Sequence, residues 1–223
     1  MWSRIVIIGG ACAALLVAVY FAGVTVGHRS APKTAEKGAD IRIDFANKPG
    51  HPGANVELSD TGSIEGFTGQ IMTLSPMPML FVDGRVDVSG GKPATPALQK
   101  SYAKIRAYMA AHDLKAAGPP IAINVDFDTI KHIWKYRAGI ALATTPAMPP
   151  SQTDGIILGS SHGGAVVRFV HLGDPNQAES TYAKIEQWMQ SKRLTASGPS
   201  WEEYTSDPQT PVSQWRTNIY VPL

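Results

Sequence analysis

Short segments in which apolar residues fall at every second position dominate residues 64–223. The clearest segment covers 121–127, where large apolar residues alternate with smaller or polar ones. This period is typical of a strand with one buried face and one wetter face. Related segments predict strands at about 64–74, 79–88, 133–143, 154–159 and 164–172, and two more follow near the C-terminus.

Two segments between these strands have helical spacing instead. In the first, Thr95 and Pro96 form a helix start, and apolar residues then recur four, three and four positions apart. In the second, Asp174 and Pro175 form the start and the same spacing follows. Each pattern predicts an amphipathic helix. The expected buried stripes are Leu98, Tyr102, Ile105 and Met109 in the first helix, and Ala178, Tyr182, Ile185 and Met189 in the second.

The two helices belong to a longer internal repeat. Moving the numbering by 80 places Tyr102–Ile105 on Tyr182–Ile185, and Gly118 on Gly198. Duplicated units usually form one pseudo-symmetric domain, because each unit alone leaves an apolar face uncovered. We therefore predict an α+β fold, in which a strand-strand-helix-strand-strand unit is used twice, at about 64–143 and 154–223. The units would form a pseudo-two-fold antiparallel sheet with two helices on one side. A ligand is then expected in a cleft between the copies or on the uncovered face.

The N-terminus has a different character from the rest of the chain. No charged residue occurs from Ile5 to Gly27. As a helix rising about 1.5 Å per residue, this segment would reach about 34 Å, enough to cross a hydrocarbon core. We expect residues 1–28 to form an uncleaved transmembrane anchor, with a cleaved signal peptide as the alternative. The membrane is thus a predicted partner through residues 5–27.

Orientation and the following linker rest on weaker patterns. Lysine and arginine occur on both flanks of the apolar segment, and their count alone would keep the domain inside. A short basic N-terminus before a long apolar run favours export, so we expect a single-pass membrane protein with an extracytoplasmic domain. Residues 29–60 carry prolines, glycines and scattered charges without a period, which predicts a flexible linker. The remaining 61–223 would form the domain.

Composition excludes several functional classes. The net charge is only +2 and the basic residues are dispersed, so nucleic acid is not an expected partner. The single cysteine, Cys12, lies in the apolar segment, which leaves the domain without a disulfide or a cysteine-ligated metal. The six histidines show no ligand spacing and no glycine-rich phosphate loop occurs. We expect neither a metal nor a cofactor.

The C-terminal segment carries a family resemblance. Gly198–Tyr204 with Asp207 and Pro208, followed by Trp215–Leu223, resembles the C-terminal signature of GyrI-like domains, also called AraC-type effector-binding domains. Val170–Gly173, before the second helix, is similar to the histidine and glycine found there in the family. The resemblance covers roughly 62–223. It implies a duplicated fold with a groove for small, often aromatic or cationic, molecules, in proteins that act as ligand sensors, sequestering proteins or, in a few branches, hydrolases.

Candidate ligand-binding residues follow from aromatic and polar side chains in this segment. Aromatic faces hold planar ligands by stacking and cations through the ring quadrupole. Glu202 and Glu203 are neighbours on a strand, so only one can face a groove, and Tyr204 shares the face of Glu202. The family often has glutamate where this chain has Asn218, which would replace charge by hydrogen bonding. The predicted ligand-binding residues, leaning towards the C-terminal copy, are Trp201, Glu202, Tyr204, Trp215, Asn218 and Tyr220.

Two other features resemble catalytic groups, but we interpret both as structural. Gly159–Gly163 fits the G-x-S-x-G pattern of a serine nucleophile elbow, which requires a helix after the serine. A predicted strand follows instead, so we interpret the segment as a glycine-rich hairpin loop. We expect His171 to be a structural residue at a strand end rather than a base. No catalytic residue is predicted.

Three functions remain open at this stage. The first is a membrane-tethered sensor or sequestering protein that binds planar aromatic or cationic small molecules, without catalysis of its own. The second is a hydrolase of a reactive small molecule, with a pocket glutamate as general base and a tyrosine as hydrogen-bond donor. The third is an interaction module for a membrane partner, whose identity the chain does not reveal.

Overall fold

The computed structural model describes residues 54–55, 63–64, 66–146, 155–207 and 209–223. The predicted anchor, at 1–28, and nearly all of the predicted linker, at 29–60, lie outside the described residues. Among the described helices, none is both long enough and apolar enough to span a bilayer. The fold is therefore that of the predicted domain.

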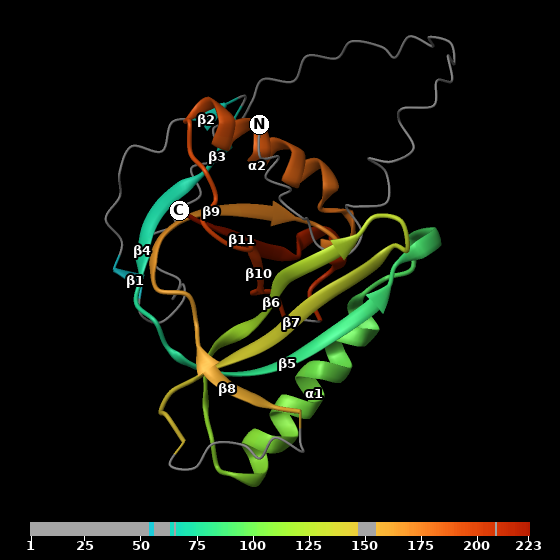
Figure 1. Ribbon diagram of the computed structural model, residues 1–223, viewed down its shortest axis with the longest axis vertical. Coiled ribbons are helices and arrows are strands. Elements are labelled where there is room, and N and C mark those ends of the chain that lie inside the picture. Colours follow the sequence, from blue (N-terminus) through green and yellow to red (C-terminus); the bar gives the residue numbers. More distant parts are fainter. Residues whose placement is uncertain (1–53, 56–62, 65, 147–154, 208) are drawn as a thin grey trace.

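A curled nine-stranded antiparallel sheet forms the centre of this domain (Figure 1). Eight of its strands lie where alternation predicts them, and a ninth, short one comes from within the predicted linker. In order across the sheet the strands are β1 (Ala54–Asn55), β4 (Gln70–Leu74), β9 (Gly164–Leu172), β11 (Arg216–Pro222), β10 (Trp201–Tyr204), β6 (Ala116–Asp128), β7 (Ile133–Leu142), β5 (Pro78–Asp87) and β8 (Ile157–Ser160). A separate two-stranded ribbon pairs β2 (Ser63–Ile64) with β3 (Phe67–Thr68).

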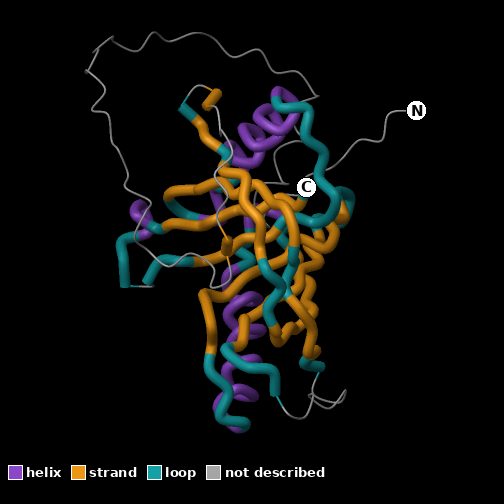
Figure 2. Tube along the Cα trace, turned by 90° about the vertical axis from the view of Figure 1, so that its left-hand side faces the viewer, coloured by secondary structure: helices purple, strands orange, loops and turns teal. Residues whose placement is uncertain are grey.

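Two helices form as the apolar spacing predicts, at Thr95–Ala111 (α1) and Glu179–Ser191 (α2). Every residue of both predicted stripes is buried. The second helix begins later than expected, because Asp174 and Pro175 start a single 3-10 turn, Pro175–Gln177 (η5), before α2. Short 3-10 turns also occur at Ser89–Gly91 (η3) and Val212–Gln214 (η6). Figure 2 shows the helices toward opposite ends of the molecule, with strands between them.

Both helices pack on the same face of the sheet. One row of cross-strand neighbours on this face starts at Val82 and passes through Ala122, Glu202 and Ile219 to Phe169. Val82 and Ala122 belong to the core under α1, whereas Ile219 and Phe169 belong to the core under α2. Glu202 is thus the polar residue in this row at the junction of two apolar cores. We call this side of the sheet the helix face.

The opposite side has an apolar core of its own, and we call it the inner face. Met72 of β4 and Met79 of β5 share this core, although five other strands lie between β4 and β5 in the sheet. Residues so far apart across a sheet can meet only if the sheet curls towards this side. Trp201 and Tyr220 lie at its centre, with ring centroids 5.0 Å apart and planes at 10°. Helices therefore cover one face, and the curled sheet encloses the other.

The strand order shows an exchange between the two ranges that we predicted as copies. Strand β4, in 64–143, pairs with β9, and strand β8, in 154–223, pairs with β5. Each range therefore contributes its first strand to the half of the sheet that carries the other range's helix. The duplication itself stays a prediction. The two ranges are interleaved in the sheet rather than placed side by side.

The loop with the G-x-S-x-G pattern joins two strands, β8 and β9, so no helix follows the serine. These strands lie in different halves of the sheet, so our expectation of a hairpin was wrong. The hydroxyl of Ser161 instead accepts a hydrogen bond of 2.8 Å from the backbone N–H of Met77. Met77 lies in the connection between β4 and β5, and the bond ties together the two connections that cross between the halves.

Candidate functional site

A cavity of about 690 Å³ opens on the helix face, between the half that carries α1 and the half that carries α2. This volume lies within the range of about 300–1,000 Å³ that is typical of small-molecule sites. Its walls come from α1, the start of β6, the β10–β11 region and η5. The sequence led us to expect a cleft between the copies or on the uncovered face, whereas this cavity lies between the two halves of the sheet and is lined by both copies. Its aromatic and charged lining residues include Tyr102, Arg106, Trp134, Glu202, Tyr204 and Trp215.

Glu202 is the central polar group of this cavity. Its side chain is only 2% exposed, because β10 lies in the middle of the sheet under both helices. The hydroxyl of Tyr182, on α2, donates to Oε1 at 2.7 Å. The hydroxyl of Tyr204, two residues along β10, donates to Oε2 at 2.8 Å. Each carboxylate oxygen therefore accepts a hydrogen bond from a tyrosine hydroxyl, an arrangement that stabilises the charged form.

The neighbouring tyrosines respond to burial and to this carboxylate. Burial raises the pKa of Tyr204 well above 10.0, and the charge of Glu202 raises it further. Burial and the same charge also raise the pKa of Tyr102, whose hydroxyl donates to the carbonyl of Ile121 at 2.9 Å. The rings of Tyr102 and Tyr204 meet edge to face, with centroids 6.5 Å apart. Both phenols thus remain neutral hydrogen-bond donors at the cavity wall at ordinary pH.

The structure separates the six predicted ligand-binding residues into two groups. Glu202, Tyr204 and Trp215 line the cavity. Trp201, Asn218 and Tyr220 lie on the inner face, because the register pairs Trp201 with Tyr220, and Asn218 with Glu203. The second group is therefore separated from the cavity by the sheet itself. The alternation of side chains along β10 and β11 places the two sets on opposite sides.

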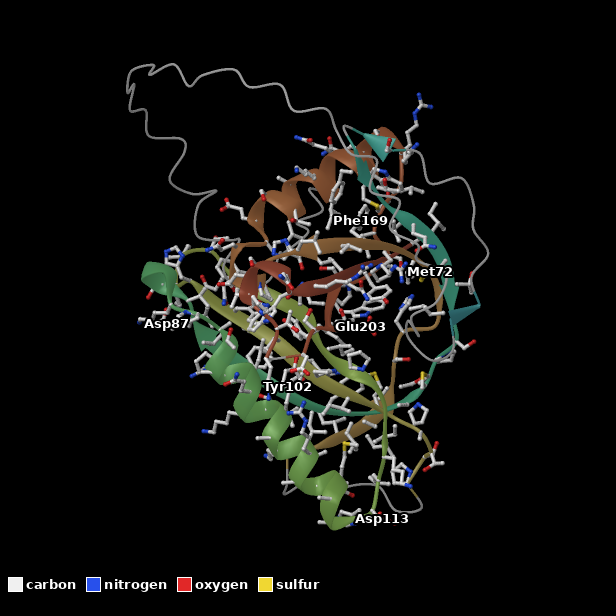
Figure 3. All side chains as sticks on the ribbon, turned by 180° about the vertical axis from the view of Figure 1, so that it is seen from behind. Met72, Asp87, Tyr102, Asp113, Phe169 and Glu203 are labelled. Carbon is white, nitrogen blue, oxygen red and sulfur yellow. The ribbon has the colours of Figure 1, made fainter. Side chains whose placement is uncertain are left out.

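The inner-face residues instead surround a second buried carboxylate. Glu203 is 2% exposed, and its Oε2 accepts from Asn218 Nδ2 at 2.8 Å and from the Tyr220 hydroxyl at 3.1 Å. Burial raises the pKa of Tyr220 above its usual value, and the charge of Glu203 adds to the shift. Figure 3 shows Glu203 near the middle of the sheet, with Tyr102 on α1. Asn218 therefore stabilises a carboxylate that faces away from the cavity, and its identity does not set the charge of the ligand site.

The first half of the domain contributes more to the cavity than the sequence indicated. Tyr102 was expected only as part of a buried helix stripe, and Trp134 only as part of the predicted strand at 133–143. Both line the cavity, together with Arg106 of α1. Both copies therefore line the cavity, and a site that leans towards the C-terminal copy stays a prediction. One signal could have identified Tyr102: it carries a polar hydroxyl in a helix stripe whose other members, Leu98, Ile105 and Met109, are not aromatic and carry no hydroxyl.

The histidines show no sign of metal chemistry in the described residues, where no group of three or more histidine, cysteine or acidic side chains converges. His171 is 6% exposed, with Nδ1 2.8 Å from Thr181 Oγ1 and Nε2 3.0 Å from the carbonyl oxygen of Asp174. These contacts join the end of β9 to η5 and to the first turn of α2. His171 occupies the structural position that the sequence predicts.

Solved structures share the fold of this domain at low sequence identity. An uncharacterised conserved protein from Listeria innocua is 17% identical, with a TM-score of 0.51, over 69% of this chain and 91% of that one. The C-terminal domain of EcmrR is 12% identical, with a TM-score of 0.60, over 70% of this chain and 97% of that one. EcmrR in a complex with DNA is 13% identical, with a TM-score of 0.60, over 71% of this chain and 58% of that one.

At the sequence level, a comparison with curated proteins found no match. Residues 69–223, which make up most of the chain and all of the described cavity, match the family described as GyrI-like small molecule binding domain. The chain belongs to the GyrI-like family of small-molecule binding domains.

Proposed function

We propose that the chain is a membrane-tethered sensor or sequestering protein that binds planar aromatic or cationic molecules in the cavity on the helix face. The observation that carries this proposal is the position of Glu202, a buried carboxylate at the junction of two apolar cores and at the wall of a cavity of about 690 Å³. Buried charge is costly unless something in the site compensates it. A ligand that brings positive charge would add to the compensation that the two tyrosines supply.

The rings around the carboxylate support a planar or cationic ligand. Tyr102, Trp134, Tyr204 and Trp215 all contribute to the cavity wall. An aromatic ring offers a flat apolar surface, and its face attracts cations, at about 0.5–2 kcal/mol for each contact depending on desolvation. Several such contacts beside the buried carboxylate of Glu202 give a site in which shape selects flat molecules and charge selects cations.

The hydrolase function ranks second. Its supporting observation is that Glu202 and Tyr204 lie together at the cavity wall, 2.8 Å apart. A general base must take a proton from water or substrate, and hydrogen bonds to its charged form weaken its basicity. Because both oxygens of Glu202 already accept a hydrogen bond from a tyrosine, the arrangement suits a fixed negative charge better than a base.

The membrane segment gives the proposed binding function a location. Residues 5–27 would hold the domain near a bilayer, where amphiphilic aromatic cations concentrate because their rings and their charge both interact with lipid. The ligands met there depend on which side the domain faces, and we propose the extracytoplasmic side. A reporter that is active on only one side of the membrane, fused to Leu223, would test this orientation.

Titration of the full-length chain with planar cations and neutral planar aromatics tests the binding function. We expect at least one planar cation to bind, and Glu202→Gln to weaken its binding by about tenfold, which is about 1.4 kcal/mol. Glu203→Gln is the matched control, because Glu203 is equally buried but faces the inner side of the sheet. The proposal fails if no compound binds the folded protein, or if the two variants weaken cation binding equally.

A further inference from the structure

Asn124 is a buried amide on β6 and is only 3% exposed. Its hydrogen bonds connect β6 to β7 and to α2 behind the wall of the cavity. The indole Nε1 of Trp134, on β7, donates to its Oδ1 at 3.1 Å. Its Nδ2 donates to the hydroxyl of Tyr182, on α2, at 3.3 Å, and to Ser200 Oγ at 3.0 Å. Asn124 does not line the cavity, yet it contacts a cavity-lining ring and the tyrosine that donates to Glu202.

The chemistry of these groups gives the chain of hydrogen bonds a direction. An indole nitrogen can only donate, so the oxygen of the Asn124 amide must point towards Trp134 and its nitrogen towards Tyr182. Since the Tyr182 hydroxyl accepts from that nitrogen, its own single proton is directed at Glu202 Oε1. The order of donation is therefore Trp134, Asn124, Tyr182 and then Glu202. Hydrogen bonds arranged in such a chain polarise one another, and the last acceptor gains most.

The titratable groups that face Glu202 come from α1, α2 and β10, and the charged residues Asp207 and Arg216 also line the cavity. Tyr182 faces it from α2 and Tyr204 from its own strand, both as donors. Tyr102 and Arg106 approach from α1, Tyr102 close enough for the Glu202 charge to act on it and Arg106 close enough to act on Tyr102. Of these donors, Tyr182 is the one that the buried Asn124 amide contacts, and this contact directs the Tyr182 hydroxyl proton towards Glu202.

We propose that Asn124 is the positioning residue that holds Glu202 as an acceptor-only anion and so makes the cavity prefer cations to neutral molecules of the same shape. The proposal rests on the proposed function, and deepens it by assigning the selectivity to a residue outside the cavity. Without the amide, the Tyr182 hydroxyl can turn away from Glu202, and the carboxyl can then carry a proton. The cavity would keep its shape and aromatic wall but lose its preference for positive charge.

Two probes of one shape and different charge test this role. The planar cation 1-methylquinolinium and the neutral 1-methylnaphthalene are titrated into the full-length chain by calorimetry, and the ratio of their affinities is the readout. We expect wild type to prefer the cation, and Asn124→Leu to lower the ratio by about tenfold, mainly through weaker binding of the cation. Ser200→Ala is the control, because it removes the other partner of Nδ2 and leaves the link to Tyr182; its ratio should equal that of wild type.

A purely structural role for Asn124 would weaken both probes together and leave the ratio unchanged, which would overturn the proposal. Trp134→Phe provides a second variant that keeps an aromatic ring and removes the donor that orients the amide. It should lower the ratio by about threefold, and a ratio equal to that of Ser200→Ala would overturn the proposal even if Asn124→Leu fails to fold. If wild type binds neither probe, the proposed function itself fails. If wild type prefers the cation and Asn124→Leu keeps that preference, only the role of Asn124 is wrong.

Discussion

Glu202 and Glu203 are consecutive residues of β10 whose carboxylates lie on opposite faces of one sheet, and each side chain is 2% exposed. Each accepts two hydrogen bonds from its own side: Glu202 from two tyrosines, and Glu203 from Asn218 and Tyr220. Of the two, Glu202 lines the cavity. Glu202 therefore lies where a ligand in the cavity can contact it, whereas Glu203 bonds residues within the sheet.

Replacing Glu203 by glutamine should destabilise the domain while leaving ligand binding within about twofold of wild type. Both bonds end on Oε2, so the amide oxygen of Glu203→Gln can still accept them, but it loses the charge assistance of both. Weakening two buried, charge-assisted hydrogen bonds in this way costs about 1–3 kcal/mol of unfolding free energy. Urea denaturation measures this loss, with Glu202→Gln compared under the same conditions. Stability equal to wild type would show that the inner-face bonds contribute nothing net.

Replacing Asn218 by aspartate should destabilise the domain without creating a stronger cation site. The change places a second carboxylate at the position from which Asn218 Nδ2 donates to Glu203, at 2.8 Å. Like charges at this distance in a buried site repel, so we expect a loss of about 2–3 kcal/mol at neutral pH. Asn218→Ala separates the loss of the donor from the added charge. Tighter binding of a planar cation by Asn218→Asp would contradict the placement of Asn218 away from the ligand.

Stability should fall on the alkaline side because several buried phenols resist ionisation. Burial and the charge of Glu202 raise the pKa of Tyr102 and Tyr204 in the folded state. A group whose folded pKa lies above its unfolded value stabilises fully below the unfolded pKa, near 10, and this contribution is lost as pH rises towards the folded pKa. Denaturation from about pH 8 to about pH 11, with phenolate absorbance recorded in parallel, should show stability falling above about pH 10.

The variant Tyr204→Phe serves as the control for this alkaline effect, because it removes one of the phenols. Its unfolding free energy should depend less steeply on pH above about pH 10 than that of wild type. An unchanged slope, or phenolate absorbance from Tyr204 appearing in the folded protein near its ordinary pKa, would contradict the burial of this hydroxyl beside Glu202.

The sequence predicts the elements of this domain well, because burial has a clear period. The stripes through Ile105 and Ile185 are both buried, and the strands fall close to their expected ranges. Strand pairing was less predictable. Nothing in the local pattern of β4 and β8 shows that each pairs in the half of the sheet that carries the other range's helix, because both halves offer an apolar strand as a partner.

The site was predictable only in part for a similar reason. Alternation along β10 correctly placed Tyr204 with Glu202 and away from Glu203. It could also have placed Trp201 on the face of Glu203, but aromatic character alone does not distinguish a residue of the enclosed core from one that faces a ligand. The link through Asn124 depends on a bond to Tyr182, which lies 58 residues further along the chain, and it has no local signal.

We propose that the ligand binds on the helix face beside Glu202. The NMR signals of the tryptophan indole N–H groups test this position most directly. Trp134 and Trp215 line the cavity, Trp201 lies on the inner face, and Trp188 is a buried residue of α2. Two-dimensional NMR of the ¹⁵N-labelled full-length chain, with signals assigned by single Trp→Phe substitutions, is recorded during titration with 1-methylquinolinium. We predict that the signals of Trp134 and Trp215 shift with the ligand, while those of Trp201 and Trp188 stay in place. Saturable shifts of Trp201, with Trp134 and Trp215 unchanged, would contradict the account and place the ligand on the other side of the sheet.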